Sequence, residues 1–309
     1  MKNKSILKLS ILIVTFLIFF GYFIPNQYIV LGCIVPIIII YALKIRYLRI
    51  KVDDILWIIC LSVIVISLVY SQDKGETVKY SIVISIMIMM KIVYSNAYEY
   101  KEYIVKLFYI SSLIHVISTI AYIVIPNIMM KICSIILPHK LYLDNIQFYN
   151  IGSIAGITGQ TGMNAFYISI YLGVVYSRII CNKHNKAYNV ISLIVGFIAL
   201  FLTAKRGPLI TNGIVMLFIA SVFSNISIKN FIPKVVGFIL IALIGWSIIS
   251  EIPQANIMLE KFNTFSESSD ITNGRSDLWD KAISRIKINP IIGIGANATP
   301  KVIGEMTHN

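Results

Sequence analysis

Long apolar runs separated by short polar segments make up most of this chain. A helix needs roughly 20 predominantly apolar residues to cross the hydrocarbon core of a bilayer. The runs repeat at about that length, so the pattern predicts an all-α fold, a polytopic transmembrane helix bundle of about nine spans. The expected spans are residues 6–24, 28–43, 54–70, 78–94, 104–125, 163–181, 188–203, 208–224 and 232–250.

The pattern changes after residue 250. We expect residues 1–250 to form the bundle and residues 251–309 to form a segment outside the membrane. In that segment five apolar residues recur at helical spacing: Leu278, Trp279, Ala282, Ile283 and Ile286. Asn273 or Ser276 can cap such a helix, and Pro290 ends it. This predicts an amphipathic helix on the membrane surface or against the bundle, with Trp279 as its interfacial anchor.

The distribution of lysine and arginine over the loops predicts the orientation. Cytoplasmic loops of membrane proteins carry an excess of these residues. A cytoplasmic N-terminus places the most basic loops of this chain inside. An odd number of spans then puts residues 251–309 on the outer face, together with the 126–162 connection and the turn at 205–207. We therefore expect the chemistry to take place outside the membrane.

Composition narrows the class of protein. A hydrophobic fraction of 57% and a charged fraction of 13% exclude an ordinary soluble domain. The net charge of +13 does not indicate nucleic acid, because the cations lie in short clusters between apolar runs, which makes the lipid bilayer the expected partner. The four cysteines have no metal-ligand spacing, and no cofactor or metal is predicted. Heavy use of Ile, Asn, Lys and Tyr is typical of an AT-rich genome and indicates a bacterial source.

Basic residues on the predicted outer face are candidates for chemistry. Lys205 and Arg206 precede Pro208, which suits the first turn of a helix. They are either an interfacial snorkelling pair or, for Arg206, a fork of donors for a phosphate. Arg275 stands at the entrance of the amphipathic helix, where backbone N–H groups favour an anion. The alternative for Arg275 is a solvated side chain paired with a neighbouring Asp.

Three other positions are notable. Histidine is the side chain best suited to exchange protons near neutral pH, so His308 could act as a general base. The stretch PIIGIGAN at 290–297 is expected to form a tight turn that lets the backbone approach a ligand or another helix. His115 lies in the middle of a span and is expected to be a hydrogen-bonded core residue.

Three segments carry a family resemblance. The first, GITGQTGMNAFYISIYLG at 156–173, enters a central span through Gly-x-Asn, and the second, LTAKRGPLI at 202–210, contains Thr-x-x-Arg-Gly. The third, NGRSDLWDKAISRIKINPIIGIGAN at 273–297 followed by THN at 307–309, combines Gly-Arg, a Trp-bearing helix, Pro-x-x-Gly-x-Gly and His-Asn. In this order they resemble the bacterial O-antigen ligase and polymerase family, the Wzy/WaaL-like membrane glycosyltransferases. The likeness covers roughly the C-terminal half of the chain.

The resemblance implies a GT-C-like, inverting, metal-independent glycosyltransferase in the bacterial cytoplasmic membrane. Its donor would be an oligosaccharide on undecaprenyl pyrophosphate. Arg206 and Arg275 would carry over as catalytic residues that bind the pyrophosphate, and His308 as the residue at the reacting acceptor. Lys205, Asn164 and Trp279 are further candidates for binding pyrophosphate or glycan. Flippase and chain-length regulator proteins are the implied protein partners.

The implied activity is polymerisation of lipid-linked repeat units into capsular polysaccharide, O-antigen or exopolysaccharide. A ligase that transfers finished glycan to a lipid or wall acceptor is the closest alternative. A transporter or flippase is disfavoured, because the spans are nearly free of charge. A non-catalytic membrane scaffold is a third possibility. Family members continue past His-Asn into further membrane helices, so we expect the full-length protein to extend beyond Asn309 and a truncated chain to be inactive.

Overall fold

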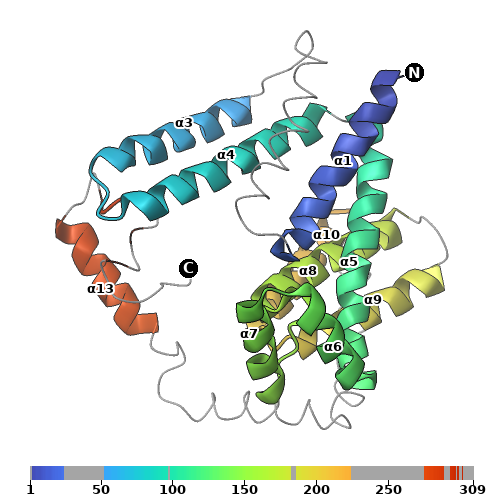
Figure 1. Ribbon diagram of the computed structural model, residues 1–309. Coiled ribbons are helices and arrows are strands. Elements are labelled where there is room, and N and C mark those ends of the chain that lie inside the picture. Colours follow the sequence, from blue (N-terminus) through green and yellow to red (C-terminus); the bar gives the residue numbers. More distant parts are fainter. Residues whose placement is uncertain are drawn as a thin grey trace. The chain divides into compact units, whose positions relative to one another are not determined.

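Helices make up all the regular structure that can be described for this chain. The computed structural model describes residues 2–23, 52–96, 98–181, 186–223, 275–288, 293–296, 298 and 301. Within these ranges every regular element is an α- or 3-10 helix (Figure 1), which confirms the all-α prediction. The elements are α1 (Lys2–Phe20), η1 (Gly21–Phe23), α3 (Val52–Ile66), η3 (Ser67–Val69), α4 (Lys74–Asn96), η4 (Tyr98–Tyr100), α5 (Lys101–Val124), α6 (Pro126–Ile136), α7 (His139–Asn150), η5 (Gly156–Thr158), α8 (Thr161–Ile180), α9 (Lys186–Leu202), α10 (Arg206–Phe223) and α13 (Arg275–Ile288).

The predicted spans coincide with helices wherever the structure describes them. These helices are α1, α3, α4, α5, α8, α9 and α10. In the described part of the chain, three segments are both long and apolar enough to cross a membrane: Val52–Val69, Lys101–Val124 and Thr161–Ile180. The spans predicted at 28–43 and 232–250 lie outside the described residues. A count of about nine spans and a GT-C-like fold therefore stay predictions.

The chain divides into two compact units. Unit 1 comprises residues 1–17, 26–101 and 265–309, and unit 2 comprises residues 18–25 and 102–264. The boundary that we expect at residue 250 stays a prediction.

Unit 1 contains the antiparallel pair α3 and α4, which lie side by side in Figure 1. Asp73 starts α4 as its N-cap, because its Oδ1 accepts a hydrogen bond from the N–H of Glu76 at 3.1 Å. At the other end of the pair, Lys91 Nζ lies 2.5 Å from both Asp53 Oδ2 and the buried Asp54 Oδ1. These ion pairs join the start of α3 to the end of α4 and fix the register of the two helices.

Unit 2 is built around α8. Ser169 and Tyr176 of α8 are bonded to Asn212 and Met216 of α10, in the same order along both helices, so α8 and α10 are parallel. The intervening α9 is antiparallel to both, because its Gly196 packs on Leu172 of α8 while its last residues lie beside the segment that precedes α8.

The interior of unit 2 is rich in aromatic and polar side chains. His115 of α5 is fully buried, stacks on Tyr167 with ring centroids 4.4 Å apart, and has Nε2 3.2 Å from the Phe19 carbonyl oxygen. A carbonyl only accepts, so Nε2 carries the proton and donates. The prediction of a hydrogen-bonded core histidine is confirmed.

The connection predicted at 126–162 contains structure that the sequence pattern did not single out. Pro126 opens α6 at its first turn, and Met129 and Cys133 pack one turn apart into the core. α7 follows after Pro138 and buries Asn145. These two helices cover the segment that leads into α8.

Candidate functional site

The turn between α9 and α10 holds the two cations that the sequence singles out in unit 2. Thr203 is buried and donates its hydroxyl to the Leu200 carbonyl at 2.7 Å. Ala204 adopts the left-handed conformation at φ 55° and donates its N–H to Phe201 at 2.9 Å, which reverses the chain. α10 then begins at Arg206. The exposed Lys205 and the half-buried Arg206 therefore stand at the positive end of a helix.

The segment before α8 is packed against this turn. The Ile154 N–H donates to the Leu202 carbonyl at 2.9 Å, and Ile154 and Leu202 belong to one buried cluster. Gly156 has φ 56°, and a Cβ there would lie 2.9 Å from Asn164 Oδ1 and 3.0 Å from Ser118 Oγ. Only glycine fits so close to those side chains. The loop before α8 is thus held next to the Lys205–Arg206 turn.

Asn164 fixes this loop from inside. The side chain is fully buried, and Nδ2 donates to Thr119 Oγ1 at 2.8 Å and to the Ile154 carbonyl at 3.3 Å. Its Oδ1 is buried and has no protein partner in the described residues. The structure therefore places Asn164 in the interior beside the loop.

A second buried group supports the same loop. Tyr122 donates its hydroxyl to Cys133 Sγ at 3.0 Å and accepts from Asn145 Nδ2 at 2.7 Å. Asn145 Nδ2 also lies 3.3 Å from the Gly156 carbonyl. Burial raises the pKa of the Cys133 thiol, so it stays neutral. The sequence analysis missed these residues; the Pro126 start and the spacing of Met129 and Cys133 were the available signals.

Because α8 and α10 are parallel, their N-termini lie at the same end of unit 2. We call this end, defined by residues 151–160 and 203–206, the loop end. Neither helix carries an acidic residue in its first turn. Two helix N-termini together with Lys205 and Arg206 make this end suited to a phosphate or pyrophosphate.

α13 confirms the predicted amphipathic helix of the C-terminal segment. Its apolar residues Trp279, Ile283 and Ile286 are exposed, as expected for a face that meets lipid or another surface. Asp277 stands in its first turn, and Arg285 and Lys287 stand in its last turn, so the charges complement the helix dipole. Ser276 lies inside the helix and is not its N-cap, because the helix begins one residue earlier. Asn273 and Pro290 lie outside the described residues.

The predicted site residues are divided between the units. Lys205, Arg206 and Asn164 belong to unit 2, whereas Arg275 and Trp279 belong to unit 1. Arg275 is the first residue of α13, as predicted. His308 lies outside the described residues. Among the residues that are described, no three His, Cys, Asp or Glu side chains gather as they would around a metal ion.

Comparison with known proteins identifies the C-terminal part of the chain. Residues 191–307 match the sequence model of a family described as O-antigen ligase. The match includes most of α9, the Lys205–Arg206 turn, α10 and α13. No curated protein and no solved structure matches the chain.

The match agrees with the apolar helices. Together they support an integral membrane protein that processes glycans. The resemblance seen at 202–210 and 273–297 lies within the matched range. The similarity of residues 191–307 to this model supports the assignment to the O-antigen ligase and polymerase family made from the sequence.

Proposed function

We propose that the protein polymerises oligosaccharide repeat units carried on undecaprenyl pyrophosphate, by glycosyl transfer at the outer face of the bacterial cytoplasmic membrane. The observation that carries the proposal is the loop end of unit 2. There Lys205 and Arg206 stand at the start of α10, at the same end as the start of α8, with no acid in the first turn of either helix. The turn lies within the family match.

The proposed chemistry needs positive charge at the leaving group. Glycosyl transfer from this donor expels a lipid pyrophosphate, so negative charge develops on its oxygens in the transition state. Fixed donors aimed at such charge typically contribute about 10²–10³ in rate each. Arg206 and Arg275 are the proposed donors, with Lys205, Asn164 and Trp279 as proposed contributors to binding. His308 is the proposed base that takes the proton of the acceptor hydroxyl.

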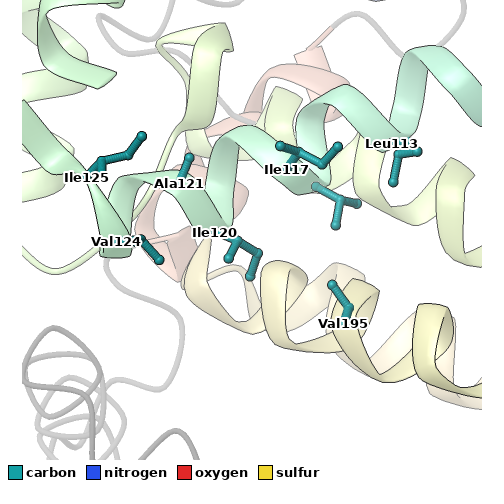
Figure 2. Close-up of a pocket in the computed structure, with 8 residues that line it drawn as sticks. Leu113, Ile117, Ile120, Ala121, Val124, Ile125 and Val195 are labelled. Carbon is teal, nitrogen blue, oxygen red and sulfur yellow. The ribbon is translucent and has the colours of Figure 1, made fainter. Parts of the chain in front are cut away.

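A groove in unit 2 supports a lipid-linked donor (Figure 2). It has a volume of about 330 Å³ and is lined only by apolar side chains: residues of α5 from Leu113 to Val124, Ile125 just after α5, and Val195 of α9. Thr119 of α5 contacts Asn164, which lies near the start of α8. From Thr119 the helix continues to Val124 and Ile125, so this end of the groove lies at the loop end. We propose that the isoprenoid chain of the donor lies in this groove, with its pyrophosphate at the cations.

A ligase shares this donor chemistry and differs in the acceptor. The heavy use of Ile, Asn, Lys and Tyr favours a low-GC organism with a capsule and thus the polymerase. A ligase would transfer finished glycan to a lipid or wall acceptor.

Complementation tests the proposal and separates the two activities. The full-length gene is expressed in a strain that lacks its own polysaccharide polymerase, with Arg206→Ala, Arg275→Ala and His308→Ala at equal membrane abundance. We expect polymer to fall about a hundredfold or more in each variant, with lipid-linked single repeats accumulating. Arg206→Lys tests charge alone, and Arg285→Ala is the matched control for Arg275 in the same helix.

The lipid-linked products decide the outcome. Single repeats accumulating in the variants support the polymerase. Long lipid-linked chains support the ligase. Wild-type behaviour of all three variants would contradict the proposed site and favour a transporter or a scaffold.

A further inference from the structure

The turn that joins α3 to α4 holds a glycine-rich segment from the far end of the chain. We call residues 67–77 the hairpin turn and residues 293–296 the glycine turn; both belong to unit 1. Gln72 donates its N–H to the Ile294 carbonyl at 3.2 Å, and Ala296 donates its N–H to Ser67 Oγ at 3.3 Å. Thr77 Oγ1 lies 2.7 Å from the Ala296 carbonyl oxygen. The two turns are therefore joined through backbone and side chains alike.

The hydroxyl groups of the hairpin turn form a directed chain. Ser71 Oγ accepts from the Asp73 N–H at 3.1 Å and lies 2.7 Å from Thr77 Oγ1. Thr77 Oγ1 has carbonyl acceptors at Ala296 and at Asp73, so its proton points to one of them. Ser71 must then donate to Thr77. The chain of donors runs from Asp73 through Ser71 and Thr77 and can end on Ala296.

Close backbone contact accompanies these bonds. Gly295 has φ 102°, and a Cβ there would lie 2.5 Å from the Ser71 Cβ and 2.7 Å from its Cα. This confirms the expectation that PIIGIGAN lets the backbone approach another element. Ser67, Ser71 and Thr77 are 4%, 7% and 0% exposed. The buried hydroxyls of Ser67 and Thr77 bond to Ala296 of the glycine turn, and that of Ser71 bonds to Thr77, so buried polar groups are paired across the contact.

The position of this contact along the chain suggests its purpose. The glycine turn lies in the sequence between Arg275, the first residue of α13, and His308. α13, which begins with Arg275, ends at Ile288, only five residues before Gly293, so fixing the glycine turn limits where α13 can lie. A displacement of about 1 Å at a catalytic group can cost about a hundredfold in rate. The hairpin turn lies outside the residues that match the family.

We propose that the hairpin turn positions the C-terminal part of the active site, with Ser71 and Thr77 as positioning residues. They act through the glycine turn on α13 and its first residue, Arg275. This inference rests on the proposed function for its catalytic meaning, but the contact itself can be tested without any activity.

A disulfide between the turns tests the contact. Ser67→Cys and Ala296→Cys are introduced together, and the natural cysteines Cys33, Cys60, Cys133 and Cys181 are replaced by serine. Because Ser67 Oγ lies 3.3 Å from the Ala296 nitrogen, we expect a disulfide in most molecules under mild oxidation. The control pairs Ser62→Cys, an exposed residue of the preceding helix α3, with Ala296→Cys and should not cross-link. If both pairs cross-link equally, or if the Ser67–Ala296 pair does not cross-link, the contact is wrong.

Substitution of Thr77 tests the positioning role. Thr77→Val keeps the shape of the side chain and removes the hydroxyl, whereas Thr77→Ser keeps the hydroxyl. We expect Thr77→Val to lower polymer about tenfold or more at unchanged membrane abundance, and Thr77→Ser to restore it. In Thr77→Val that also carries the cysteine pair, oxidation should restore polymer and reduction should remove it, because the disulfide replaces the lost bond.

The results separate the positioning role of the hairpin turn from the proposed polymerase function. Restored polymer in the oxidised Thr77→Val protein supports positioning. Full activity of Thr77→Val contradicts the positioning role. Loss of activity on cross-linking in the cysteine-pair protein that keeps Thr77 also contradicts it. If the cysteine-pair chain cross-links but the wild-type chain makes no polymer, the proposed function is refuted and the contact stays established.

Discussion

Gly293 and Gly295 show how far a single residue can be interpreted. Both have positive φ, 71° and 102°, but their surroundings differ. A Cβ at Gly293 would meet nothing within 4 Å, whereas a Cβ at Gly295 would overlap Ser71. Conformation alone therefore requires glycine at 293, and both conformation and contact require it at 295.

Alanine at these two positions should separate the two requirements. We expect Gly293→Ala to lower the free energy of unfolding by about 1 kcal/mol, which is the usual penalty for a left-handed alanine. Gly295→Ala should cost at least about 1 kcal/mol more, because the hairpin turn must move. Thermal unfolding of the purified protein in detergent measures both. Equal losses would show that the contact with Ser71 contributes nothing.

The site residues differ in how far the sequence could predict them. The positions of Lys205, Arg206 and Arg275 at helix starts follow from local signals, a Pro two residues after Arg206 and an amphipathic pattern after Arg275. The environment of Asn164 could not be predicted, because it depends on Thr119 and Ile154, which reach it through tertiary packing. Local patterns place residues on elements, and only the fold shows which side chains meet.

At the scale of elements, apolar length predicted the helices α5 and α8 well, because few other structures satisfy the backbone of an apolar run in a bilayer. α6 and α7 were missed, since short helices in a mixed segment lack such a signal. The groove between α5 and α9 was also beyond prediction, because it depends on how closely two helices pack.

Filling the groove should test its role. Ile117 lines the groove and is 58% exposed, whereas Ile114 is 40% exposed on the same helix and does not line it. We expect Ile117→Trp to raise the KM for the lipid-linked donor about tenfold, since lost contacts with even two methylene groups are worth about that much. Ile114→Trp, with the same added ring, should leave the KM near that of the wild type. Assays in detergent with purified donor give both KM values. The same KM for both variants would show that the groove does not bind the donor.

For the whole molecule, the orientation in the membrane is the first property to test. Lys205 lies at the loop end, and Lys140 in the first turn of α7 lies near it, because the next residue, Leu141, contacts Gly159. Glu102 lies in the first turn of α5, at the opposite end of unit 2. All three side chains are exposed. In a chain whose natural cysteines are replaced, we expect a membrane-impermeant maleimide to label Lys140→Cys and Lys205→Cys on intact cells, and Glu102→Cys only after the membrane is opened. The reverse pattern would place the loop end in the cytoplasm and contradict the proposed site of reaction.

The contact between the hairpin turn and the glycine turn also has a consequence for how the protein is made. Thr77 and Ala296 are 219 residues apart, and Ser67 and Ala296 are 229 apart. During synthesis at about 5–20 residues per second, the hairpin turn waits ten seconds or more for its partner. Throughout that time water must take the place of Ala296 as the partner of Ser67 and Thr77, whereas the bonds within the hairpin turn can already form. Closing so long a loop is a late event in folding, so the hairpin turn should be open to proteases and chaperones in the nascent chain and protected only after the glycine turn has been made.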